Sequence, residues 1–145
     1  MEQLKLAALD EEDLKIISAH VQDALVKAGD LEYVPSRKFF IMPLNRFAWE
    51  CSKSGFFREH KERRNCVLHF GCVLSARRTG IDPQKPGEVL ELLAILFTPG
   101  EAPAGSIDLI FSGSAAIRLE VECIEARLCD LGAAWAAQSR PAHMI

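Results

Sequence analysis

Hydrophobic residues near the start of the chain recur every three or four positions, which is typical of an amphipathic helix. The pattern predicts a helix from Glu11 to about Lys27. Asp10 precedes it as an N-cap whose carboxylate can accept amide protons of the first turn, and Gly29 suits its C-terminal end. The apolar positions of this stripe are Leu14, Ile17, Val21, Ala24 and Leu25.

Further along the chain the apolar residues alternate with polar ones, and this period of two predicts strands. Residues 68–76 place Leu68, Phe70, Cys72, Leu74 and Ala76 on one face. Residues 89–97 are apolar on both faces apart from Glu91, which is typical of a central strand. The other predicted strands are 31–34, 38–42 with an extended continuation through 47–50, 107–111 and 117–121, the last two joined as a hairpin by Ser112–Ser114.

Two stretches lack this alternation. Cys51–Arg64 is polar and rich in charge, so it is expected to be a long surface loop. From about Cys123 the spacing of Ile124, Leu128 and Leu131 predicts a second helix that ends near Gly132.

This order of elements predicts an α+β fold: an antiparallel sheet or barrel of about six to seven strands between an N-terminal and a C-terminal helix. The strands are expected to be antiparallel because their links are too short for parallel crossovers. A strand meander closed by a C-terminal helix makes a pleckstrin-homology-like barrel one form of this fold, and an α+β sandwich is the other.

Composition adds limits to this picture. The chain has 145 residues, of which 49% are hydrophobic and 26% charged, so it is expected to fold as one globular domain spanning 1–145. Its longest apolar stretch is far shorter than the roughly 20 residues of a membrane span. Five cysteines without a C-x-x-C pair suggest buried thiols and a cytoplasmic location, and no metal or cofactor is expected.

Charge is unevenly distributed along the sequence. Residues 37–78 hold ten basic and three acidic residues, whereas the rest of the chain holds seven basic and 17 acidic ones. Such segregation can attract an anionic partner, such as a nucleic acid or another phosphate ligand. The candidate anion-binding residues are Arg37, Lys38, Arg46, Arg58, Lys61, Arg63, Arg64, Arg77 and Arg78.

No nucleophile elbow, zinc-protease motif, Walker loop or dinucleotide fingerprint is present in the sequence. The four histidines have no metal-ligand spacing. The residues therefore favour a non-catalytic binding or adaptor module that contacts a protein partner or a second copy of the chain. Anion or nucleic-acid binding by the basic segment is the alternative, and an enzyme with a site assembled from scattered residues such as His69, Glu120 and Arg118 is a weaker one.

Three segments carry a family resemblance: LDEEDLKIISAHVQDALVKAGDLEYVP, LNRFAWE and IRLEVECIEARLCDLGAAWAAQSRPAH. They resemble the bacterial domain-of-unknown-function family 2948, which is mainly alphaproteobacterial, and the resemblance covers about residues 4–143. It implies a small, soluble, cytoplasmic bacterial protein of one domain. It assigns no activity and therefore no site residue.

Overall fold

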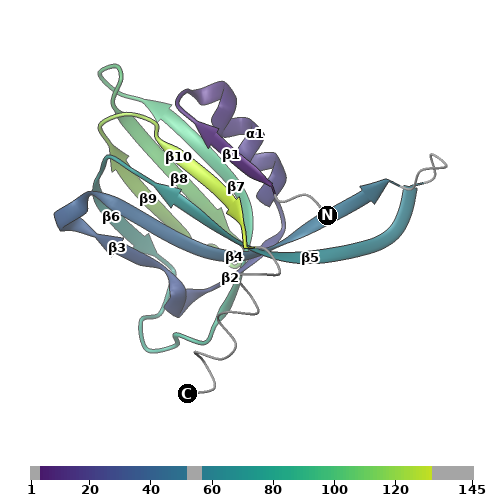
Figure 1. Ribbon diagram of the computed structural model, residues 1–145. Helices are drawn as coiled ribbons and strands as arrows, with labels where there is room; N and C mark the ends of the chain where they lie inside the picture. The colour runs from purple at the N-terminus through teal and green to yellow at the C-terminus, as the bar shows by residue number, and fades with distance from the viewer. Residues whose placement is uncertain (1–3, 52–56, 132–145) are drawn as a thin grey trace.

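The computed structural model describes residues 4–51 and 57–131, and within them the side chains of 4–46 and 63–131. This part of the chain holds ten strands and one α-helix (Figure 1). The elements in chain order are β1 (Lys5–Ala8), α1 (Glu11–Val21), β2 (Ala24–Lys27), the 3-10 turn η1 (Ala28–Asp30), β3 (Glu32–Val34), the 3-10 turn η2 (Pro35–Arg37), β4 (Phe39–Cys51), β5 (Phe57–Phe70), β6 (Val73–Thr79), β7 (Val89–Pro99), β8 (Gly105–Phe111), β9 (Ala116–Val121) and β10 (Ala126–Asp130).

The strands form one antiparallel sheet in the order β1-β10-β5-β4-β2-β7-β8-β9-β6, and β3 pairs with β4 beside this path. The sheet curls on itself, so that its last strand β6 returns to the start of β4. There the amide of Val73 in β6 donates to the carbonyl of Lys38, just before β4, at 2.8 Å. Figure 1 shows α1 beside β1 and β7 on one side of this curled sheet. The distal part of the β4–β5 hairpin extends away from the rest of the sheet.

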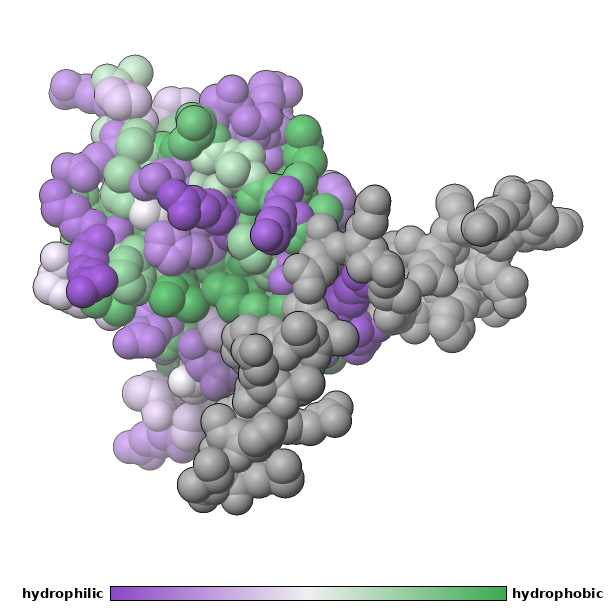
Figure 2. Space-filling model, in the orientation of Figure 1, coloured by the Kyte–Doolittle hydropathy of each residue, from purple (hydrophilic) through white to green (hydrophobic). Residues whose placement is uncertain are grey.

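One hydrophobic core lies inside the curl. Alternate residues of the strands point into it, and the apolar stripe of α1 covers it with Leu14, Ile17 and Val21. The largest buried rings are Phe40, Phe70 and Phe111, which come from three different strands. Some apolar residues also reach the surface among hydrophilic ones, as the face in Figure 2 shows. Those that are large and exposed are Leu9, Ile16, Leu74, Val89, Leu93 and Leu96.

The predicted α+β fold with a helix at each end is wrong, because the described chain is mostly antiparallel sheet with one short helix. The predicted second helix is strand β10, in which Ala126, Leu128 and Asp130 are buried on one face. Pairing with β1 and β5 on its two sides satisfies the backbone of β10, and this tertiary context overrides the helical spacing. The predicted pleckstrin-homology-like barrel is wrong for the same reason, because it required the C-terminal helix. The ten strands of the described chain also exceed the six to seven predicted.

The first helix begins at Glu11 as predicted, and the Asp10 carboxylate accepts the Asp13 amide at 2.8 Å. It ends at Val21 rather than near Lys27. Gln22 after it is already extended, with φ of −60° and ψ of 135°, and Asp23 then adopts a left-handed backbone conformation with φ of 67°, so the chain leaves the helical path. The following residues form β2, whose pairs with β7 bury Ala24 and Val26.

Three other differences concern the strands. The predicted loop Cys51–Arg64 is wrong for 57–64, which belong to β5, while 52–56 lie outside the described residues. Alternation has no diagnostic value where a hairpin extends beyond the core, as this one does. The predicted strand 68–76 is two strands, separated at Gly71 and Cys72. The short strand β1 was not predicted. By contrast, the strands predicted at 89–97, 107–111 and 117–121 are confirmed.

Candidate functional site

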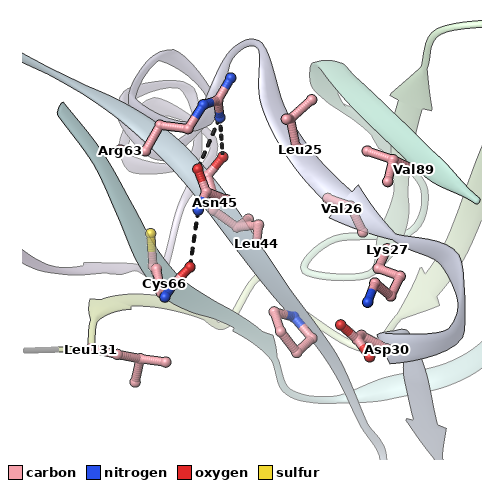
Figure 3. Close-up of a pocket in the computed structure, with 12 residues that line it drawn as sticks. Leu25, Val26, Lys27, Asp30, Leu44, Asn45, Arg63, Cys66, Val89 and Leu131 are labelled. Atoms are coloured by element: carbon pink, nitrogen blue, oxygen red, sulfur yellow. Dashed lines mark hydrogen bonds between the residues drawn. The ribbon is translucent and has the colours of Figure 1, made fainter. Parts of the chain in front are cut away.

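A groove opens where β2 and β4 diverge. In the described part of the chain the register of these two strands consists of Leu25 opposite Asn45, although β2 pairs with β7 over four residues. The space beside this pair has a volume of about 440 Å³, and we call it the β2–β4 groove (Figure 3). Its lining residues are Leu25, Val26, Lys27, Asp30, Pro43, Leu44, Asn45, Arg63, Asn65, Cys66, Val89 and Leu131.

Most of the groove is apolar, but β4 and β5 supply a polar wall. Asn45 and Asn65 stand opposite each other in the register, and the Asn45 amide Nδ2 donates to Asn65 Oδ1 at 3.0 Å. Arg63 Nη1 donates to the Asn45 carbonyl oxygen at 3.1 Å and to Asn45 Oδ1 at 2.9 Å. Figure 3 shows these bonds at one end of the groove, with Lys27 and Asp30 side by side at the other.

A buried ion pair lies on the opposite face of the same strands. Successive residues of a strand point to opposite faces, so Arg46 points into the core where Asn45 faces the groove. Arg46 Nε and Nη2 donate to Asp130 Oδ1 and Oδ2 at 2.9 and 2.7 Å. The amide of Leu4 donates to Asp130 Oδ2 at 3.0 Å, and Arg64 Nη1 lies 3.6 Å from the same oxygen. This bidentate pair fixes β4 to β10 and to the start of β1.

The ion pair sets the protonation of its members. The hydrogen bond to Asp130 raises the pKa of the Arg46 guanidinium. Burial alone raises the pKa of the Asp130 carboxyl, but the hydrogen bonds from Arg46 and the Leu4 amide outweigh it and bring that pKa below its ordinary value. Cys66, which lines the groove and pairs with Asp130, has a pKa of about 12, raised by burial and by the Asp130 charge. Its thiol is therefore protonated near neutral pH.

The lowered pKa of Asp130 predicts acid sensitivity. The folded state binds the Asp130 proton less tightly than the unfolded state does. The stabilisation that the ionised Asp130 carboxylate gives the fold is therefore complete above the unfolded-state pKa of about 4, and it is lost as pH falls through the lower folded-state pKa. We therefore expect the difference in unfolding free energy between the wild type and Asp130→Asn to shrink as pH falls. Urea unfolding at a series of pH values from about 6 to 2 measures it. A difference that does not change with pH would contradict this assignment.

The structure divides the predicted basic residues among several places. On the β4–β5 hairpin, Arg46 and Arg64 meet at Asp130, and Arg63 bonds to Asn45. Arg58 and Lys61 belong to β5, but their side chains lie outside the described ones.

The other basic candidates lie around η2 and β6. Lys38 pairs with Glu122 at 3.3 Å, and Arg78 Nη2 donates to the Leu31 carbonyl at 3.2 Å. Arg37 is exposed in η2, and Arg77 is exposed opposite Arg118 in the register of β6 and β9. The described contacts thus bring together Arg46 and Arg64, and they engage several of the others within the chain.

The scattered enzyme candidates have separate partners. The His69 ring packs against Phe39, with ring centroids 5.0 Å apart. Arg118 forms a bidentate pair with Asp108, at 2.8 and 3.1 Å, and Glu120 accepts from Ser106 at 2.9 Å. Each of these side chains contacts a residue of the neighbouring strand, and none of these contacts joins His69 to Arg118 or Glu120.

Sequence reasoning missed the two asparagines of the groove. Asparagine is depleted in strands, so the occurrence of Asn45 and Asn65 next to predicted strands was the available signal. The groove also depends on where β2 leaves β4, which the sequence pattern does not encode.

The fold and groove define a class: a curled antiparallel β protein with one helix and an apolar groove that has a polar wall. The family model described as "Protein of unknown function (DUF2948)" matches residues 4–143, and the chain belongs to this family, which confirms the resemblance seen in the sequence. No curated protein and no solved structure matches the chain. Within the described ranges, no helix combines the length and the apolar character that crossing a membrane requires.

Proposed function

We propose that this protein is a non-catalytic binding module whose β2–β4 groove holds a small ligand with an apolar body and a polar, hydrogen-bonding end. The observation that carries the proposal is the divergence of β2 from β4 beside the Leu25–Asn45 pair, which opens a space of about 440 Å³. Small-molecule sites in proteins typically have volumes of roughly 300–1,000 Å³.

The lining supports a ligand of two chemical parts. Leu25, Pro43, Leu44, Val89 and Leu131 offer apolar contacts, whose burial against a ligand is favourable in proportion to area. The Asn45–Asn65–Arg63 wall offers amides and one positive charge, held in place by its own hydrogen bonds. A few fixed polar groups on an apolar surface are the usual basis of orientation and specificity in such sites.

The same wall favours binding over proton-transfer chemistry. Amides do not titrate, and a guanidinium stays protonated in proteins. The Cys66 thiol is also held protonated, with a pKa of about 12. The groups at this end of the groove therefore keep one protonation state near neutral pH, which suits a stable hydrogen-bonding surface for a ligand.

The experiment uses 1-anilinonaphthalene-8-sulfonate as the probe, because it joins an aromatic body to an anionic sulfonate. We expect the wild type to bind it with a saturable rise in fluorescence. Val89 is 56% exposed at the groove, so Val89→Trp should fill the space and weaken binding at least about tenfold, or about 1.4 kcal/mol.

Leu74→Trp is the matched control, because Leu74 is a 50% exposed strand residue of β6 outside the groove and the change also adds one tryptophan. It should bind as the wild type does. Asn45→Asp is a second variant that adds a negative charge beside Arg63 and should also weaken binding of the sulfonate. Equal affinity in the wild type, Val89→Trp and Asn45→Asp would overturn the proposal, as would no binding by the folded wild type.

Anion or nucleic-acid binding by the basic segment stays a prediction, as do a protein partner and the cytoplasmic location. The internal partners of Arg46, Arg63, Arg64 and Lys38 favour the groove over a surface where these charges act together. Electrostatic binding to nucleic acid weakens steeply with salt, so affinity for mixed RNA and DNA against salt concentration distinguishes the two functions.

A further inference from the structure

Two cysteines lie in contact at a corner of the sheet, away from the groove. Cys72 stands between β5 and β6, and Cys123 stands between β9 and β10. Their Sγ atoms are 3.4 Å apart, and both residues are partly exposed. Cys72 Sγ also donates to Glu125 Oε1 at 3.4 Å, so the three side chains form a chain of hydrogen bonds from Cys123 to Cys72 to Glu125.

The backbone holds this arrangement. Two backbone hydrogen bonds join the β5–β6 link to the β9–β10 link: the Glu122 amide donates to the Cys72 carbonyl at 2.9 Å, and the Gly71 amide donates to the Glu125 carbonyl at 2.8 Å. Cys72 has a φ of 58°, which is uncommon for a residue with a side chain. The surrounding hydrogen bonds maintain this conformation at the residue whose thiol meets Cys123.

We propose that Cys72 and Cys123 are a redox-active dithiol that closes to an intrachain disulfide by exchange with a low-molecular-weight disulfide such as oxidised glutathione. Cys72 and Cys123 are not partners in the strand register, which pairs Val73 with Val121, so the proposal rests on the contact between their sulfur atoms. Bond formation therefore needs the sulfurs to approach from 3.4 Å to about 2 Å, which side-chain rotation supplies.

The exchange proceeds in two balanced steps. The Cys123 thiol loses its proton to solvent, and its thiolate attacks one sulfur of oxidised glutathione, forming a mixed disulfide and releasing a glutathione thiolate that takes up a proton. Cys72 then loses its proton to solvent and its thiolate attacks Cys123 Sγ, releasing the second glutathione as a thiolate that takes up a proton. The two cysteines together lose two electrons, and one glutathione disulfide is reduced to two thiols.

The order of attack follows from the surroundings of the two thiols. The hydrogen bond with Cys123, burial and the hydrogen bond with Glu125 raise the pKa of Cys72 to about 12. Cys72 is therefore a poor source of thiolate and acts second, when its target is held next to it.

The test exposes the reduced, folded, full-length protein to excess oxidised glutathione and follows intact mass and proteolytic peptides without reductant. We expect the wild type to lose about 2 Da, with the peptides that contain Cys72 and Cys123 joined to each other. Wild-type protein in which these two residues stay free, or stop at separate glutathione adducts, would overturn the proposal.

Variants separate the roles of the residues. Cys72→Ser should stop with one glutathione on Cys123, whereas the control Cys129→Ser should still form the 72–123 link. Glu125→Gln should close the mixed disulfide faster than the wild type, because it removes the carboxylate that raises the pKa of Cys72. A Glu125→Gln variant that closes no faster than the wild type would overturn the role of Glu125, and loss of the link in Cys129→Ser would overturn the pairing.

Discussion

Asp130→Ala is expected to lower the free energy of unfolding by about 3–5 kcal/mol, which is the usual cost of breaking a buried ion pair. The Asp130 side chain is 2% exposed and the Arg46 side chain 8% exposed. Removing the carboxylate leaves the Arg46 guanidinium buried without its bidentate acceptor, and it takes away the oxygen that accepts the Leu4 amide. Urea denaturation followed by circular dichroism measures the change.

Asp108→Ala provides the matched control. Asp108 also forms a bidentate pair with an arginine, but the Arg118 side chain is 52% exposed. Pairs that remain in contact with water contribute about 0–1 kcal/mol, so this variant should lose little stability. Similar small losses in both variants would show that the Asp130 pair is not the buried structural link described here.

Leu128→Ala is expected to lower the free energy of unfolding by about 2–5 kcal/mol, the usual range for a fully buried leucine. Leu128 is completely buried in β10, where it stands opposite Leu6 of β1 on one side and Leu68 of β5 on the other. Truncation removes apolar contacts and leaves a cavity in the middle of three strands, which cannot easily collapse.

The control for this change is Leu74→Ala in β6, where the leucine is 50% exposed and its loss should cost well under about 1 kcal/mol. Denaturant unfolding of both variants against the wild type gives the comparison. A loss at Leu128 as small as that at Leu74 would contradict the placement of β10 inside the sheet.

The sequence predicts the elements whose pattern is long and unambiguous. β7, β8 and β9 follow from their apolar residues, and the start of α1 follows from the Asp10 cap, which bonds as expected. These signals are local, since they depend on spacing within one segment and on the orphan amides of a first helical turn.

The short segments are decided by distant partners. Ala24 and Leu25 fit a helical stripe as well as a strand, and the same holds for Leu128. β2 becomes a strand because β7 pairs with it, and β10 because β1 and β5 lie on its two sides. In segments of four or five residues, an alternation of apolar and polar residues does not distinguish a strand from a helix. The partner strands decide between them.

The candidate site was harder to predict for a similar reason. The basic residues of 37–78 were visible as a group in the sequence, but the carboxylate that pairs with Arg46 and Arg64 is Asp130, which stands 84 residues after Arg46. The groove needs the register that sets Asn45 against Asn65 and the point at which β2 leaves β4. Neither follows from residue types alone.

The proposed binding groove is tested most directly by mapping the bound sulfonate probe on the isotope-labelled full-length protein by NMR. Addition of 1-anilinonaphthalene-8-sulfonate should shift amide signals that cluster at Leu25–Lys27, Leu44, Asn45 and Val89, with the Asn45 and Asn65 side-chain amides among them. Shifts that cluster instead on the exposed apolar residues Ile16, Leu93 and Leu96 of α1 and β7, with the groove signals unchanged, would contradict this account.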